Sequence, residues 1–126
     1  MVTGRAADDP ASGTAALRDR LRAALTEAMK ARDRVAAAAL RSALAAIDNA
    51  EAVEVPEVRA GAIEDSATGL GSAEVPRRDL SAGDIAAIVR AEIHERRSAA
   101  AEYESGGLLD RAGRLRAEAD ALAALL

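Results

Sequence analysis

Residues 81–126 read SAGDIAAIVRAEIHERRSAAAEYESGGLLDRAGRLRAEADALAALL, with apolar side chains recurring at intervals of three and four. At about 100° per residue, this spacing gathers them on one face of a helix. The apolar face of the first helix comprises Ile85, Ile88, Val89, Ile93, Ala100 and Tyr103. That of the second comprises Leu108, Ala112, Leu115, Ala119, Leu122 and Leu126. Because Ser105-Gly106-Gly107 is a stop signal between them, the sequence predicts a helical hairpin.

A second helical hairpin is predicted upstream, over residues 14–52. The apolar face of its first helix, residues 14–31, comprises Leu17, Leu21, Ala24, Leu25 and Ala28. The second helix, residues 34–52, has two apolar faces and can be packed on two sides. One face holds Ala36, Leu40, Ala43, Leu44 and Ile47, and the other holds Val35, Ala39, Ala46 and Ala50. The very short connection favours an antiparallel return, with one continuous bent helix as the alternative.

Polar residues predict where these helices begin. Thr14 is the expected N-cap of the first helix, and Asp33 that of the second, because short polar side chains can accept a hydrogen bond from a free helical N–H. Ser81 is the expected N-cap of the third helix. Asp84 follows it three residues later, which is a weaker form of the capping box.

Prolines and glycines break the helical pattern between residues 53 and 80, where Pro56, Gly61 and Pro76 occur. We expect a long irregular connection there, with room for a short helical turn over residues 56–67. Residues 1–13 are expected to form a disordered N-terminal segment. The length of 126 residues suits one small domain. The predicted fold is therefore all-α, with about four helices in two hairpins that form a small bundle over residues 14–126.

The composition excludes several kinds of chemistry. The chain has no cysteine, which excludes disulfides, thiolate nucleophiles and cysteine-ligated zinc. His94-Glu95 begins like the zinc-binding pattern H-E-x-x-H, but Ser98 stands in the fifth position and the chain has no second histidine. Lys30, the only lysine, follows Met29, so no phosphate-binding Gly-Lys-Ser/Thr sequence exists. We expect no catalytic constellation, no metal site and no cofactor.

One charged pair lies on the apolar face of the third helix. Arg96 falls about 20° from Ile85 around the helix, and Glu92 lies beside it, one turn earlier. We expect both side chains to point inward and to form an ion pair. Two interpretations follow: a structural pair at the seam between helices, which we favour, or a guanidinium presented in a groove to a phosphate or carboxylate.

Basic side chains define two further candidate surfaces. Residues 14–52 hold seven basic and five acidic side chains. The candidate nucleic-acid-binding residues there are Arg18, Arg22, Lys30, Arg32, Arg34 and Arg41. The second patch, on the outer face of the third helix, comprises Arg90, His94 and Arg97, for which a plain solvated surface is the alternative. Tyr103 is the only aromatic residue and lies on an apolar face, which argues against stacking of unpaired bases.

The charge and hydropathy patterns favour a cytoplasmic protein. The net charge of -4 is mild and spread along the chain, so no charged tail stands out. The N-terminal residues contain no apolar run typical of a secretory signal, and no segment has about 18 uncharged apolar residues in succession. We therefore expect no contact with a membrane.

Several short motifs resemble the GatB/YqeY family. They are Ala28-Met29-Lys30-Ala31-Arg32-Asp33, Leu40-Arg41, Ile47-Asp48-Asn49-Ala50-Glu51, Arg96-Arg97, Glu102-Tyr103 with Gly107 and Asp110, and Ala117-Glu118. The resemblance covers residues 16–126 apart from the long connection. The chain departs from the family at Ala99, Leu108 and Arg111. It resembles only the N-terminal portion of the family, which normally continues through a Y-L-P segment into a second helical domain.

The resemblance implies an auxiliary role. The similar domain forms the tail of the B subunit of tRNA-dependent amidotransferase, where it contacts tRNA outside the catalytic centre. A non-catalytic module that contacts tRNA or amidotransferase subunits is the leading hypothesis. The alternatives are a protein-interaction or dimerisation module, which would pair with a second copy of the chain, and a carbon–nitrogen ligase that takes its amide nitrogen from glutamine. The last rests on the family label alone.

Overall fold

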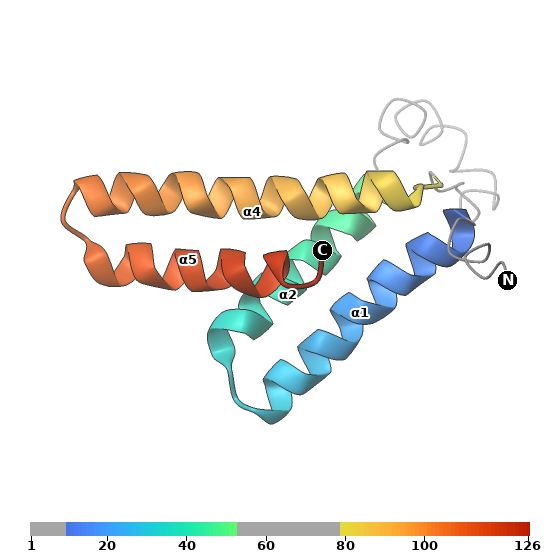
Figure 1. Cartoon of the computed structure of the whole chain (residues 1–126), viewed down its shortest axis with the longest axis horizontal. Coiled ribbons are helices and arrows are strands. Elements are labelled where there is room, and N and C mark those ends of the chain that lie inside the picture. Colours follow the sequence, from blue (N-terminus) through green and yellow to red (C-terminus); the bar gives the residue numbers. More distant parts are fainter. Residues whose placement is uncertain (1–9, 53–78) are drawn as a thin grey trace, which may run out of the picture.

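The computed structural model describes residues 10–52 and 79–126 of the chain. These residues form four helices and no strand: α1 (Pro10–Lys30), α2 (Arg34–Ala52), α4 (Ala82–Ser105) and α5 (Leu109–Ala123). Figure 1 shows α4 and α5 lying side by side as one hairpin, with α1 and α2 forming a second hairpin across one end of it. The all-α fold predicted from the sequence is confirmed.

The core lies where the two hairpins cross, and all four helices contribute to it. It is entirely aliphatic, and its largest fully buried side chains are Leu21, Leu40, Ile47, Ile85, Val89 and Leu122. Fully buried alanines, among them Ala39, Ala43 and Ala119, let the helices approach closely. No polar or charged residue of the described segments is fully buried, so hydrophobic packing holds this part of the fold together.

One end of the α4–α5 hairpin projects beyond the first hairpin (Figure 1). It consists of the C-terminal half of α4 and the N-terminal half of α5, which run side by side on either side of their turn. Ala100 and Ala112 are buried there, outside the main core. Arg116 of α5 also bonds Glu104 of α4, with 2.7 Å between nitrogen and oxygen. The projecting end is therefore held by small apolar contacts and surface ion pairs between two helices only.

The turn between α1 and α2 is a true hairpin turn, so the alternative of one continuous bent helix is wrong. The Asp33 N–H donates to the Ala28 carbonyl oxygen at 2.8 Å, and Arg32 adopts a left-handed backbone with φ 59°. The Asp33 carboxylate then accepts a hydrogen bond from the Ala36 N–H at 3.0 Å, which confirms Asp33 as the N-cap of α2. The chain thus ends one helix and begins the next within three residues.

Replacing Asp33 by alanine should lower the free energy of unfolding by about 1 kcal/mol, because the first turn of α2 loses its cap. Thermal melts followed by circular dichroism will measure the change. Asp33→Asn keeps an accepting oxygen at the same position and is the matched control, with an expected loss below about 0.5 kcal/mol. Equal losses in the two variants would show that the carboxylate acts by charge and not as a cap.

The helix limits agree with the sequence predictions at α2 and α4 and differ at α1 and α5. The capping box at Ser81 and Asp84 is confirmed, with both hydrogen bonds at 3.0 Å. Helix α1 begins at Pro10, so Thr14 lies inside the helix and is not its cap; proline suits a first turn because its missing N–H is not needed there. Helix α5 ends at Ala123, and Ala124 and Leu125 follow in a turn, so Leu126 lies outside the helix.

The two segments predicted to be irregular, residues 1–13 and 53–80, lie largely outside the described residues. Of the expected N-terminal segment, residues 10–13 belong to α1, and residues 1–9 lie outside the described residues. Residues 53–78 of the expected connection, including the helical turn considered over residues 56–67, also lie outside them. Asp79 and Leu80 are described, and Leu80 packs against the core just before α4 begins.

Candidate functional site

A polar network joins three helices beside the core. The Arg96 guanidinium of α4 bonds Glu92 through Nη1 and Glu118 of α5 through Nε, each at 2.8 Å. Glu92 Oε1 also accepts a hydrogen bond from the Ser42 hydroxyl of α2 at 2.8 Å. The three charged side chains are only 13–16% exposed. The predicted inward ion pair of Glu92 and Arg96 is thus present, and it is part of a larger network.

The surroundings of Arg96 keep it charged. Burial alone lowers the pKa of the guanidinium, but the hydrogen bonds that it donates to Glu118 and Glu92, together with their negative charges, outweigh this effect, so the pKa of Arg96 is raised. Two carboxylates already bind this guanidinium, which leaves it poorly placed to receive a phosphate ligand. The geometry therefore favours the structural interpretation, in which Arg96 ties α4 to α5 and, through Glu92, to α2.

Only half of this network can be predicted from the sequence. Glu92 and Arg96 share one helix, so their spacing predicts the pair. Glu118 and Ser42 come from other helices, and only the packing of those helices brings them to Arg96. Glu118 did occur among the motifs of the family resemblance, which was the one signal available for it.

The six candidate nucleic-acid-binding residues of the first hairpin do not form one surface. The Arg18 side chain is only 15% exposed and bonds Glu51 of α2. A second carboxylate of α2, that of Asp48, lies 3.6 Å from the Arg18 guanidinium. It therefore joins the two helices of the hairpin. Arg22 and Lys30 make loose surface contacts within α1, at 3.9 Å to Asp19 and 3.8 Å to Glu27.

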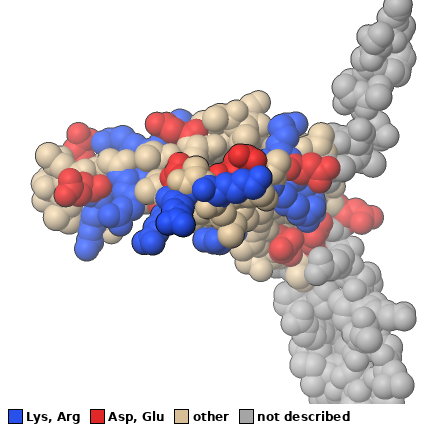
Figure 2. Space-filling model, turned by 90° about the horizontal axis from the view of Figure 1, so that it is seen from below, with Lys and Arg blue, Asp and Glu red and all other residues tan. Residues whose placement is uncertain are grey.

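Three of the six candidate cations lie at the hairpin turn. Lys30 ends α1, Arg32 lies in the turn and Arg34 begins α2, and all three are exposed; we call them the turn cations. Arg41 is exposed two turns further along α2. Figure 2 views the molecule from the side where this turn lies and shows Lys and Arg side chains interspersed with Asp and Glu. The turn cations thus belong to a surface that carries both positive and negative side chains (Figure 2), and hydrogen bonds fix the backbone of the turn.

The second predicted patch is also exposed. Arg90, His94 and Arg97 all face solvent on the outer side of α4. Arg97 lies 3.9 Å from Asp120 of α5, a loose contact between two well-exposed side chains. Tyr103 is half-buried, and the guanidinium of Arg111 lies 5.6 Å from its ring centre. Its ring is therefore not a free stacking platform.

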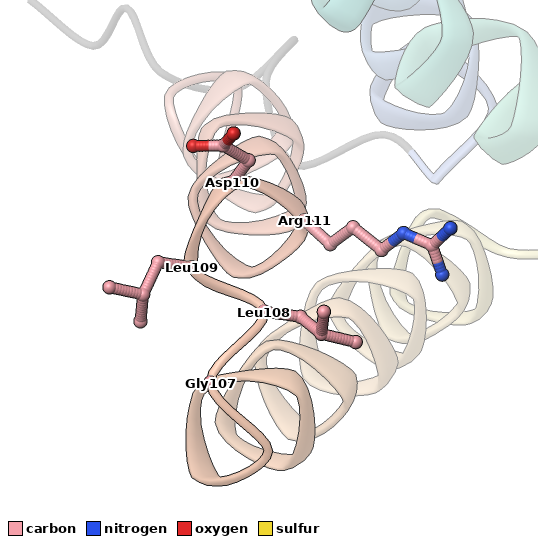
Figure 3. Close-up of a pocket in the computed structure, with 5 residues that line it drawn as sticks. All are labelled: Gly107, Leu108, Leu109, Asp110 and Arg111. Carbon is pink, nitrogen blue, oxygen red and sulfur yellow. The ribbon is translucent and has the colours of Figure 1, made fainter.

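A shallow open hollow lies at the turn between α4 and α5 (Figure 3). Its lining residues are Gly107, Leu108, Leu109, Asp110 and Arg111. Figure 3 shows the side chains of Leu109, Asp110 and Arg111 pointing in different directions, so the hollow does not gather polar atoms around one point. Leu108 and Leu109 are 48% and 63% exposed, which makes this end of the hairpin apolar.

Two features are absent from the described helices. No three side chains of the histidine, aspartate and glutamate type come together there in a way that would hold a metal ion. None of these helices combines the length and the apolar character needed to cross a membrane.

Comparisons with protein families, with curated proteins and with solved structures gave no match to this chain.

Proposed function

We propose that the chain is a non-catalytic helical module of the cytoplasm that contacts tRNA through the turn cations. The observation that carries the proposal is the exposure of Lys30, Arg32 and Arg34 on one ordered turn. The resemblance of the sequence to the GatB/YqeY family supports tRNA as the partner. That resemblance also supports a second contact, with subunits of an amidotransferase.

The chemistry of these residues favours recognition of phosphates. Arginine and lysine side chains bind phosphate oxygens with strong, charge-assisted hydrogen bonds, and such contacts carry little sequence information. Tyr103 is no free platform for stacking, because it is half-buried and the Arg111 guanidinium lies 5.6 Å from its ring centre. The module is therefore expected to bind folded RNA by shape and charge, with marked dependence on salt.

Titration of labelled tRNA tests the proposal. If the three turn cations each contact a phosphate, raising the salt from about 50 to about 200 mM should weaken binding roughly 40-fold. The triple variant Lys30→Gln, Arg32→Gln, Arg34→Gln should lose most of that binding and of its salt dependence. The control is Arg20→Gln, Arg114→Gln, Arg116→Gln, which removes the same charge from exposed positions outside the turn cations and the second basic patch and should bind within about threefold of the original chain.

Two results would contradict the proposal. Absence of tRNA binding at low salt would show that the chain does not contact tRNA directly. Equal loss in the two triple variants would show that the overall charge, and not the hairpin turn, governs binding. The substituted side chains are all exposed, so both variants are expected to keep the original melting temperature.

A protein-interaction module is the second candidate, and the exposed Leu108 and Leu109 favour it. Light scattering at increasing concentration distinguishes dimerisation from a monomer. The carbon–nitrogen ligase alternative has only the family label behind it. The Ser42 hydroxyl does bond a carboxylate, but that carboxylate, Glu92, is already paired with Arg96. Glutaminase and amide-transfer assays on the chain are expected to give no activity.

A further inference from the structure

His94 lies in the middle of α4 and points away from the core. On a helix, the side chains three and four residues away are its neighbours. For His94 these are Arg90 and Ala91 on one side and Arg97 and Ser98 on the other, and all five residues are exposed. The imidazole thus has a guanidinium one turn before it and another one turn after it, with a small alanine and a hydroxyl beside them.

The charge around His94 is positive. None of its four neighbours on the helix is acidic. Arg90 has no ion-pair partner among the described residues, and the only carboxylate near Arg97 is Asp120, at 3.9 Å. Those two side chains are 57% and 77% exposed, so the contact is loose and leaves the Arg97 guanidinium free to turn toward a ligand. Glu95 follows His94 in the sequence but lies about 100° further around the helix.

This arrangement suits the transfer of a phosphoryl group. A neutral imidazole is a nucleophile near neutral pH, and His94 is the only histidine of the chain. Arginine pairs well with phosphate oxygens, and two guanidiniums would hold a dianionic group from both sides. We propose that His94 is a phosphoryl acceptor whose donor is a small acyl phosphate, with Arg90 and Arg97 as positioning residues for the phosphoryl oxygens.

The phosphoryl transfer needs no reagent other than the acyl phosphate. The unprotonated ring nitrogen of His94 attacks phosphorus, and a P–N bond forms while the P–O bond to the acyl group breaks. The acyl group leaves as a carboxylate, and the ring proton passes to solvent. No oxidation or reduction takes place. The two arginines lower the repulsion between the donor's negative charges and the rest of the acidic protein during attack.

Incubation of the intact chain with acetyl phosphate labelled on phosphorus tests the proposal. We expect labelling at His94, found by peptide mapping, in the form of an acid-labile phosphoramidate. His94→Gln should carry no label. Arg90→Gln with Arg97→Gln should slow labelling about tenfold or more, and Arg90→Lys with Arg97→Lys should recover part of the rate because the charge is kept. Acetylation of Lys30 adds no labelled phosphorus and is distinguished by mass.

A relocated histidine is the matched control. In the double variant His94→Gln, Ala23→His, the imidazole is exposed on α1 with Asp19 and Glu27 four residues away on either side. Arg20 lies three residues before it and bonds the Leu125 carbonyl oxygen. That variant should be labelled at least tenfold more slowly than the original chain. Equal rates would overturn the proposal, because any exposed histidine would then react as well. Acid-stable label on Ser98, or no label on the original chain, would also overturn it.

Discussion

Arg96→Ala is expected to lower the free energy of unfolding by about 2 to 3 kcal/mol. The substitution leaves the carboxylates of Glu92 and Glu118 without their shared cation, although each is only 15–16% exposed. Unpaired charges in such a place are costly, and the two carboxylates would also repel each other. Urea or thermal unfolding followed by circular dichroism measures the loss, which should appear as a lower midpoint with an unchanged slope.

Arg97→Ala is the matched control, because it removes the same side chain one residue later in the same helix. Arg97 is 57% exposed and makes only the loose contact with Asp120, so its loss should cost less than about 0.5 kcal/mol. Equal melting temperatures for the two variants would contradict the network. The triple variant Glu92→Gln, Arg96→Met, Glu118→Gln should recover part of the stability lost in Arg96→Ala, since no charge is left unpaired.

The fold could largely be predicted because its determinants are local. The turn at Asp33, the capping box at Ser81 and the stop at Ser105-Gly106-Gly107 each depend on residues within one or two helical turns of one another. The start of α1 could not be predicted as well, since residues 10–13 carry no apolar periodicity and include Ser12 and Gly13, which have low helix propensity. Local signals therefore located the hairpins more reliably than the ends of the helices.

The candidate site was harder to predict because it depends on contacts between helices. Arg18 has the same sequence context as other basic residues of α1, yet it bonds Glu51 of α2 and is only 15% exposed. The angular position of Arg96 around α4 predicts that its side chain points inward. Its second partner, Glu118, could not be predicted because it depends on how α5 packs against α4. Helical phase tells which face a residue occupies, and it does not tell which residue of a neighbouring helix lies opposite.

Leu21→Ala is expected to lower the free energy of unfolding by about 3 to 4 kcal/mol, the largest effect of the substitutions considered. Leu21 is fully buried in the core where the hairpins cross. Its truncation removes apolar contacts and leaves a cavity, and a helical scaffold of this kind closes such a cavity only in part. Because the core is small and contains many alanines, few large side chains are available to share the loss. Thermal melts should show a fall of more than about 10 °C.

Leu109→Ala supplies the control for Leu21→Ala. Leu109 begins α5 and is 63% exposed, so the same chemical change there should cost less than about 0.5 kcal/mol. A comparable loss at both positions would mean that the exposed leucines of the α4–α5 turn are buried in solution, and concentration-dependent melting would then identify a second copy of the chain as the covering surface. A small loss at Leu21 would instead show that the two hairpins do not share one core.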